Sequence, residues 1–137
     1  MNQRFDAVII GAGVIGACVA FELAKQGWKT LNVDKNASAG YGSTSGSCAI
    51  IRTYYSVYET CAVAYEGWFH WKDWPGYLGV ADPRGMAVYH DTGCLVVKTE
   101  HNKGLGHIAR IMDRIGCPYQ HLTPDEMKAR LPLIDLH

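Results

Sequence analysis

Residues 5–16 read FDAVIIGAGVIG, a short apolar run that leads directly into the glycine pattern G-x-G-x-x-G. The apolar run predicts a β-strand, and the pattern after it predicts a helix over residues 14–26. In such a turn Gly11 permits a sharp exit from the strand, Gly13 leaves room for a pyrophosphate, and Gly16 lets the helix pack closely on the strand. The phosphates would then face the unpaired N–H groups at the start of the helix. The stretch therefore predicts a dinucleotide-binding site.

The residues after this helix complete a strand–helix–strand unit. Gly27 stands where helices commonly end, and residues 29–33 predict a second strand that ends on Asp34. Asp34 follows Gly16 at close to the ~20-residue spacing expected of the acid that binds a ribose hydroxyl. The alternative is a nucleotide-free doubly wound domain in which Asp34 is an ordinary turn residue. The order of strand, glycines, helix, strand and acid favours nucleotide binding.

The composition is that of a folded domain. The chain has 137 residues, enough for one domain or part of one, with 48% hydrophobic residues and a formal net charge of zero. Its Lys and Arg residues form no basic run, which argues against nucleic-acid binding. Glycines and Glu22 interrupt the apolar start, so we expect neither a signal peptide nor a membrane span. The five cysteines are widely spaced without a C-x-x-C pattern, which predicts free thiols, no metal site and a reducing, cytoplasmic location.

The middle of the chain begins with residues 34–47, a loop rich in glycine and serine. Its small side chains suit a segment pressed against a ligand, and a plain surface loop is the alternative. A capping box formed by Ser56 and Glu59 then predicts a helix over residues 57–74, which Pro75-Gly76 should stop. We interpret the aromatic stripe along this helix as core packing.

The rest of the chain predicts a mixture of strands and helices. Residues 86–90 and 94–98 predict two strands joined by a three-residue hairpin loop. Residues 103–115 predict a helix, and residues 119–122 predict a short strand. The sequence TPDE at residues 123–126 predicts the start of a last helix that ends near Leu131, since it combines an N-cap threonine, a proline and a glutamate at the third position.

Together these elements predict an α/β fold, with an N-terminal Rossmann-like βαβ unit followed by the start of an α+β insertion. We expect residues 1–80 to belong to the dinucleotide-binding domain and residues 81–137 to begin an incomplete substrate or cap domain. A nicotinamide-binding domain would normally continue with further β-α units after the ribose acid. Here a loop, an aromatic helix and a hairpin follow instead, which is typical of larger FAD enzymes.

Short sequence segments along most of the chain, beginning with the glycine turn, can be compared with known families. They are VIIGAGVIG at residues 8–16, LAKQG at 23–27, DK at 34–35, GSTSGS at 42–47 with IIRTYYS at 50–56, and LTPDE at 122–126. Together they resemble the N-terminal part of the glycine oxidase, sarcosine oxidase and D-amino-acid oxidase superfamily of FAD-dependent oxidoreductases. The resemblance covers nearly the whole chain, whereas members of this superfamily are much longer. It therefore implies that further polypeptide or a partner chain completes the protein.

The resemblance also implies how FAD would be held, from its pyrophosphate to its flavin ring. The implied contacts are Gly11, Gly13, Ile15 and Gly16 at the pyrophosphate, Asp34 at the adenosine ribose, Lys35 beside the adenine, Ser43 and Thr44 along the phosphate and ribityl run, and Ala49 and Ile50 against the flavin ring. No residue of the chain is assigned to a metal.

Arg52 matches a position that holds the substrate carboxylate in relatives of sarcosine oxidase. A guanidinium suits this task because its fork pairs both carboxylate oxygens at once. A structural or surface arginine is the alternative.

Two differences from members of the superfamily limit which substrate and which flavin linkage the resemblance implies. Monomeric sarcosine oxidases carry histidine at the position of Ser45 and arginine at that of Ala49, which argues against sarcosine itself as the substrate. No histidine lies between Asp34 and Tyr55, whereas the dimethylglycine dehydrogenase type attaches its flavin through a histidine in this loop. We therefore expect non-covalent FAD.

The activity that the resemblance implies is oxidation of the C–N bond of an amine or amino acid, by hydride transfer to the flavin N5 atom. The flavin supplies the difficult chemistry, and the protein positions a small-molecule substrate. Two alternatives remain from the residues alone. The chain is an NAD-dependent dehydrogenase or nucleotide-binding module, or it is a non-catalytic fragment or subunit that needs a partner.

Overall fold

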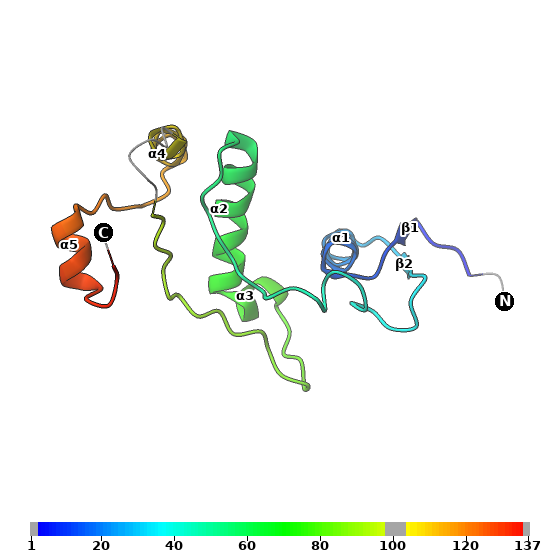
Figure 1. Ribbon diagram of the computed structural model, residues 1–137. Helices are drawn as coiled ribbons and strands as arrows, with labels where there is room; N and C mark the ends of the chain where they lie inside the picture. The colour runs from blue at the N-terminus through cyan, green and yellow to red at the C-terminus, as the bar shows by residue number, and fades with distance from the viewer. Residues whose placement is uncertain (1–2, 98–103, 136–137) are drawn as a thin grey trace. The chain divides into compact units, whose positions relative to one another are not determined.

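A computed structural model describes residues 3–97 and 104–135 of the chain, and Figure 1 traces its elements. The chain divides into two compact units, Met1–Ile50 and Ile51–His137. The first contains one small sheet with a helix, and the second contains four helices. Each unit is described by itself below.

The first unit is the predicted strand–helix–strand unit. Strand β1 spans Ala7–Ile10, helix α1 spans Val14–Lys25, and strand β2 spans Thr30–Val33. The two strands pair in parallel, with Ala7 opposite Thr30 and Ile10 opposite Val33. Helix α1 contacts both strands and lies beside them in Figure 1. This part of the sequence prediction is therefore confirmed.

The two faces of the β1–β2 sheet differ because side chains alternate along each strand. Ile9 and Asn32 lie on the face toward α1, since the Asn32 side-chain amide donates a hydrogen bond to the Gly16 carbonyl at 3.1 Å and Ile9 lies close to the same glycine. The other face is apolar and exposed, and its residues are Val8, Ile10, Leu31 and Val33.

The second unit is built on helices α2 (Tyr58–Lys72), α3 (Trp74–Leu78), α4 (Gly104–Ile115) and α5 (Pro124–Arg130). Helix α2 contacts both α3 and α4. A small core joins α2 to α4, and its buried residues are Cys61, Ile111, Met112 and Cys117. The predicted helix over residues 103–115 is thus confirmed from Gly104 onward, while Lys103 lies outside the described residues.

Both cysteines of this core bond to the same threonine. The Cys61 thiol donates to the Thr53 carbonyl oxygen at 2.9 Å, and the Cys117 thiol lies 3.5 Å from the Thr53 hydroxyl oxygen. Burial raises the pKa of the Cys117 thiol above its usual value. These thiols therefore act as small core side chains that satisfy their one polar bond locally.

The long predicted helix differs from the structure at both ends. Its N-cap is Val57, without a side-chain cap, so the capping box predicted from Ser56 and Glu59 is wrong. At the other end, Pro75-Gly76 does not stop the helix but lies inside α3. The reason is Asp73, whose carboxylate accepts a hydrogen bond from the Gly76 N–H and starts a new helix, in which proline is tolerated in the first turn.

The predicted hairpin and the short third strand are wrong. Residues 86–90, 94–97 and 119–122 form no strand, and Lys98 lies outside the described residues. The described part of the chain contains one sheet, made of β1 and β2. An isolated pair of short strands is marginally stable in water, so apolar alternation alone does not make a ladder without further strands beside it.

The last helix is confirmed in detail. The Thr123 hydroxyl accepts from the Glu126 N–H at 3.3 Å, and the Glu126 carboxylate accepts from the Thr123 N–H at 2.8 Å. This is the reciprocal capping box that the TPDE sequence predicts. Among the helices described, none is both long and apolar enough to span a membrane.

Candidate functional site

The glycine turn between β1 and α1 is the best-defined candidate site. Gly11 has φ +109°, a backbone conformation that side chains other than hydrogen strongly disfavour. Its N–H donates to the Val33 carbonyl of β2 at 2.7 Å, which fixes the turn to the sheet. A Cβ at Gly16 would collide with the Gly11 carbonyl oxygen, so glycine there allows the first turn of α1 to approach the end of β1.

The loop that follows β2 folds back on this turn and makes three hydrogen bonds to it. The Asp34 carboxylate accepts from the Ala12 N–H at 2.8 Å, and the Gly40 N–H donates to the Ala12 carbonyl at 2.8 Å. The Thr44 hydroxyl oxygen accepts from the Val14 N–H at 3.0 Å. We refer to Asp34, Gly40 and Thr44 as the clasp. Through these three hydrogen bonds, residues 34–44 help to hold the glycine turn in place. A plain surface loop would not make such bonds.

Asp34 is held in its ionised form by the backbone. Bonds from the N–H groups of Ala12 and Asn36, the first of them the larger effect, lower the pKa of its carboxyl below the usual value. The side chain is exposed and lies directly after β2. Its remaining acceptor capacity can therefore meet a ribose hydroxyl, as the sequence predicts.

The start of α1 offers hydrogen-bond donors to an anion. Val14 is capped by Thr44, whereas in the described part of the chain no hydrogen-bond acceptor is found for the N–H groups of Gly13, Ile15 and Gly16. Unpaired N–H groups at a helix N-terminus, together with the helix dipole, favour phosphate. Three donors beside an acid after the second strand fit the diphosphate and ribose of a dinucleotide.

The other predicted cofactor contacts lie on the same unit. Lys35 and Ser43 are exposed on the loop, and Ile50 is 79% exposed at its end. Ala49 has φ +53°, which is unusual for a residue with a side chain, and its N–H donates to the Ser47 hydroxyl oxygen at 3.1 Å. Holding a residue with a side chain in this conformation costs energy, which the surrounding structure must offset.

Arg52 lies in the second unit, against two tyrosine rings. Its guanidinium carbon is 4.3 Å from the centre of the Tyr55 ring and 5.3 Å from that of Tyr54. The contact with Tyr55 is the main cause that raises the pKa of the guanidinium further above its usual value. The side chain is exposed, so this permanent cation is oriented by the two tyrosines and remains accessible to solvent.

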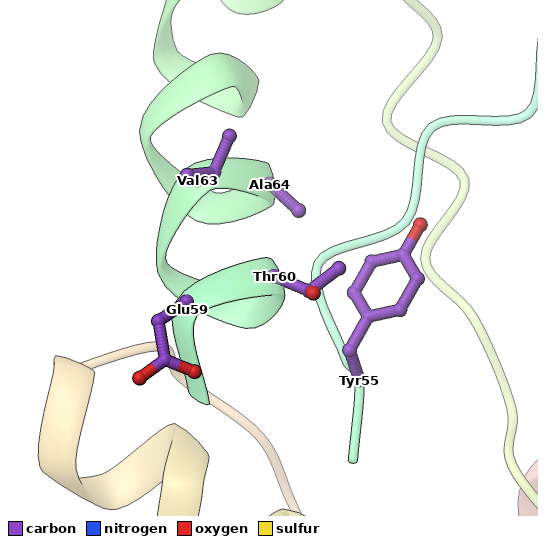
Figure 2. Close-up of a pocket in the computed structure, with 5 residues that line it drawn as sticks. All are labelled: Tyr55, Glu59, Thr60, Val63 and Ala64. Carbon is purple, nitrogen blue, oxygen red and sulfur yellow. The ribbon is translucent and has the colours of Figure 1, made fainter. Parts of the chain in front are cut away.

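A surface hollow of about 480 Å³ lies on the second unit beside Tyr55, and it is largely open to solvent. Figure 2 shows the Tyr55 ring and the Thr60 side chain facing each other, while the Glu59 carboxylate points away from the ring. Val63 and Ala64 complete its lining. The sequence analysis did not identify this hollow, because no local pattern marks it.

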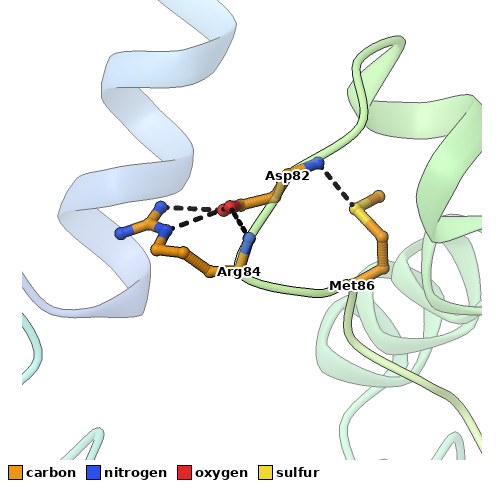
Figure 3. A network of polar contacts seen from close by, with 3 residues as sticks. All are labelled: Asp82, Arg84 and Met86. Carbon is orange, nitrogen blue, oxygen red and sulfur yellow. Dashed lines mark hydrogen bonds and ion pairs between the residues drawn. The ribbon is translucent and has the colours of Figure 1, made fainter.

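Two further contacts were missed by the sequence analysis. Asn32, the polar residue inside an otherwise apolar strand, ties α1 to β2, and its polarity is the signal that could have identified it. A second group, on the surface, consists of Asp82, Arg84 and Met86 (Figure 3). Among the residues described, no cluster of three or more His, Cys, Asp or Glu side chains is arranged to hold a metal ion.

Comparison with known proteins places these features in a family. Residues 6–137 match the sequence model described as FAD dependent oxidoreductase. Peroxisomal sarcosine oxidase of Mus musculus is 28% identical over 131 residues, which cover 95% of this chain and 32% of that protein. A probable sarcosine oxidase of Arabidopsis thaliana is 31% identical over 126 residues, which cover 82% of this chain and 28% of that protein.

A solved structure agrees with these matches. The crystal structure of L-proline dehydrogenase from P. horikoshii has a TM-score of 0.76 to this chain at 27% identity, and covers 98% of this chain and 34% of that one. The chain thus spans about a third of the length of the relatives it matches.

Proposed function

The chain belongs to the family of FAD-dependent oxidoreductases, and on that premise we propose that the protein binds FAD without a covalent link and oxidises the C–N bond of an amine or amino acid. The observation that carries the proposal is the glycine turn, with three unpaired N–H groups at the start of α1 and an ionised Asp34 directly after β2. This arrangement suits the diphosphate and ribose that FAD carries.

In this proposal the first unit holds the cofactor from its diphosphate to its flavin ring. The N–H groups of Gly13, Ile15 and Gly16 donate to the diphosphate, and Gly11 gives the turn its shape. Asp34 accepts from the ribose hydroxyls. The remaining contacts follow the loop outward: Lys35 beside the adenine, Ser43 and Thr44 along the ribityl run, and Ala49 and Ile50 against the flavin ring.

Arg52 is the proposed anchor for the substrate carboxylate. Its guanidinium lies against the faces of Tyr54 and Tyr55, which leaves the N–H groups at its edge for two carboxylate oxygens. When bound, the flavin supplies the acceptor for a hydride from the C–H bond beside the amine nitrogen, at its N5 atom. The contribution of this chain is to fix the carboxylate, so that the substrate is oriented before reaction.

We also propose that residues 1–80 belong to the FAD-binding domain and residues 81–137 begin a substrate domain. Further polypeptide or a partner chain would complete both.

The first test is the visible absorption spectrum of the full protein before and after acid precipitation. Flavin bands that move to the supernatant are expected, because they indicate non-covalent FAD. Bands that stay in the pellet would contradict the non-covalent link, and a colourless protein that also fails to take up added FAD would contradict the cofactor.

The second test is anaerobic reduction of the bound flavin by a panel of primary, secondary and N-methyl amino acids and amines without a carboxylate. Bleaching by amino acids is expected. Arg52→Gln should raise KM for carboxylate-bearing substrates about tenfold or more, as loss of a charged pair implies. Arg84→Gln, which removes another exposed arginine, is the matched control and should leave KM unchanged. A panel without any reducing substrate would refute the substrate class.

A further inference from the structure

The three glycines of the turn exclude a side chain for three different reasons. Gly11 needs a positive φ, and Gly16 would bring a Cβ into the Gly11 backbone. Gly13 has φ −79° and ψ −175°, an extended conformation that any residue can adopt. Neither backbone conformation nor neighbouring backbone therefore requires glycine at position 13.

The obstacle at position 13 is one side chain. A Cβ built on Gly13 would lie 2.9 Å from the Thr44 hydroxyl oxygen and 4.0 Å from the Thr44 Cβ. The first distance is closer than such contacts tolerate, while the second is an ordinary contact. The space above Gly13 is thus occupied by this chain's own Thr44.

Thr44 cannot give way without a loss. Its hydroxyl oxygen is the acceptor for the Val14 N–H at 3.0 Å, and the N-cap residue of α1 offers no side-chain bond of its own. A methyl group at position 13 would push the hydroxyl off the Val14 N–H and leave the helix start uncapped.

We propose that Thr44 is a positioning residue that caps α1 from the far end of the loop, and that its hydroxyl group is a second reason for glycine at position 13, besides the room that a diphosphate needs. The pair sets the shape of the turn in the protein without cofactor. Thr44 accepts from the Val14 N–H, while in the described part of the chain the N–H groups of Ile15 and Gly16 have no acceptor. The inference therefore goes beyond cofactor binding and holds whether or not FAD is the ligand.

The test is a double-mutant cycle on the full protein, read first as the melting temperature in the absence of FAD. Gly13→Ala should lower the melting temperature by about 1–2 °C, and Thr44→Ala by a similar amount, because each removes the cap. The double variant should melt no lower than Thr44→Ala alone, since an alanine at 13 then meets nothing. Additive losses, or no loss from Gly13→Ala, would overturn the proposal.

Gly16→Ala is the matched control. Its Cβ meets backbone and not Thr44, so Gly16→Ala combined with Thr44→Ala should be additive. Thr44→Ser, which keeps the hydroxyl, should melt close to wild type and should keep the penalty of Gly13→Ala. If Gly13→Ala fails to fold, recovery of folding in the double variant supports the pairing, and failure of the double variant where Thr44→Ala folds refutes it.

The FAD affinity of the same variants, measured by titration, is the second quantity to compare. Thr44→Ser should keep the FAD affinity, and Thr44→Ala should weaken it roughly tenfold through the less ordered turn. Gly13→Ala is expected to weaken FAD binding in either background, because a diphosphate needs the space above position 13, so the melting cycle and not the titration decides the pairing. An unchanged FAD affinity in Thr44→Ala would contradict the positioning role of Thr44. If wild type binds no FAD, the FAD proposal fails, while the melting cycle still decides the pairing.

Discussion

The two units of the chain are held together in different ways. Among its described residues the first unit buries no side chain fully, and its form is set by hydrogen bonds to the backbone: the parallel ladder, the glycine turn and the clasp, in which two side chains accept from backbone N–H groups. The second unit has a small core in which Cys61 is fully buried, and side-chain packing sets its form. The first unit should therefore be sensitive to changes in backbone geometry, and the second to changes in side-chain volume.

The same contrast explains the exposed side of the first unit. Val8 and Ile10 of β1 lie open although they are apolar, with Ile10 89% exposed. An apolar sheet face normally packs against another layer of the same fold. The hydrogen bonds of the turn do not depend on that layer, so the part of the candidate site that faces the diphosphate and ribose is defined within residues 11–44.

Gly16→Ala is expected to have the largest combined effect, because it lowers both the stability of the first unit and the affinity for FAD, whereas a core truncation in the second unit lowers stability alone. The new Cβ would meet the Gly11 carbonyl, which no side-chain rotation can relieve. We expect a loss of about 2–3 kcal/mol in the free energy of unfolding and about a 100-fold weaker FAD affinity, measured by thermal melting and flavin fluorescence titration.

Gly67→Ala is the control for this prediction. Gly67 lies in α2 with open space at its Cβ position, so alanine should stabilise the protein by about 0.5–1 kcal/mol. A Gly16→Ala variant that melts and binds FAD like wild type would contradict the backbone account of the first unit.

Ile111→Ala tests the packing-determined unit and should rank second. Ile111 is 8% exposed in the core between α2 and α4, and its truncation leaves a cavity. We expect a loss of about 2–4 kcal/mol in the free energy of unfolding, read from urea denaturation of the second unit's tryptophan fluorescence. Val63→Ala on the exposed side of α2 should change it by less than about 0.5 kcal/mol. Equal effects at the two positions would mean that this core does not hold the unit together.

This difference also decides what the sequence could predict. The strand–helix–strand unit and the TPDE capping box were predicted correctly, because each depends on residues within one turn or one βαβ unit. Family membership and FAD as its cofactor were likewise predicted and are confirmed by the match over residues 6–137. The individual site residues stay predictions.

The failures have both distant and local causes. The hairpin over residues 86–98 has good strand residues but lacks neighbouring strands, and the start of α2 uses no side-chain cap. Asp73 starts α3 because its carboxylate accepts a hydrogen bond from the Gly76 N–H. The Pro75-Gly76 dipeptide alone does not reveal this bond. The contact of Thr44 with Val14 joins residues whose pairing no local pattern encodes.

Asp34→Asn should have a moderate, pH-dependent effect on the first unit. The carboxylate accepts from Ala12 N–H with one oxygen and from Asn36 N–H with the other, whereas an asparagine has only one acceptor oxygen. Because the folded pKa is lowered, the stabilisation is present above the unfolded pKa of about 3.9 and is lost as pH falls through the folded pKa. The variant should melt lower than wild type at pH 7, and the difference should shrink below about pH 4. A difference that is constant from pH 7 to pH 3 would show that the charge of Asp34 is not involved.

Arg84→Gln should have the smallest effect, because it removes an ion pair whose arginine side chain lies almost entirely in solvent, while the turn's bonds from the Gly85 and Arg84 N–H groups to Asp82 remain. The Arg84 guanidinium bonds to both Asp82 oxygens, at 3.0 Å and 2.7 Å, and the Arg84 side chain is 88% exposed (Figure 3). These bonds are the main cause that lowers the pKa of Asp82 to about 2, and the Arg84 backbone N–H adds a second bond that the variant keeps. The pKa of Asp82 should therefore rise part of the way toward about 3.9, as a carboxyl NMR titration can measure.

The wild-type protein loses the small stabilisation from this ion pair only as pH falls from about 4 toward 2. The melting temperature at pH 7 should therefore change little, because the arginine of the pair is exposed to solvent. A clear loss of stability at pH 7 would mean that residues 82–86 support the second unit in a way that their exposure does not suggest.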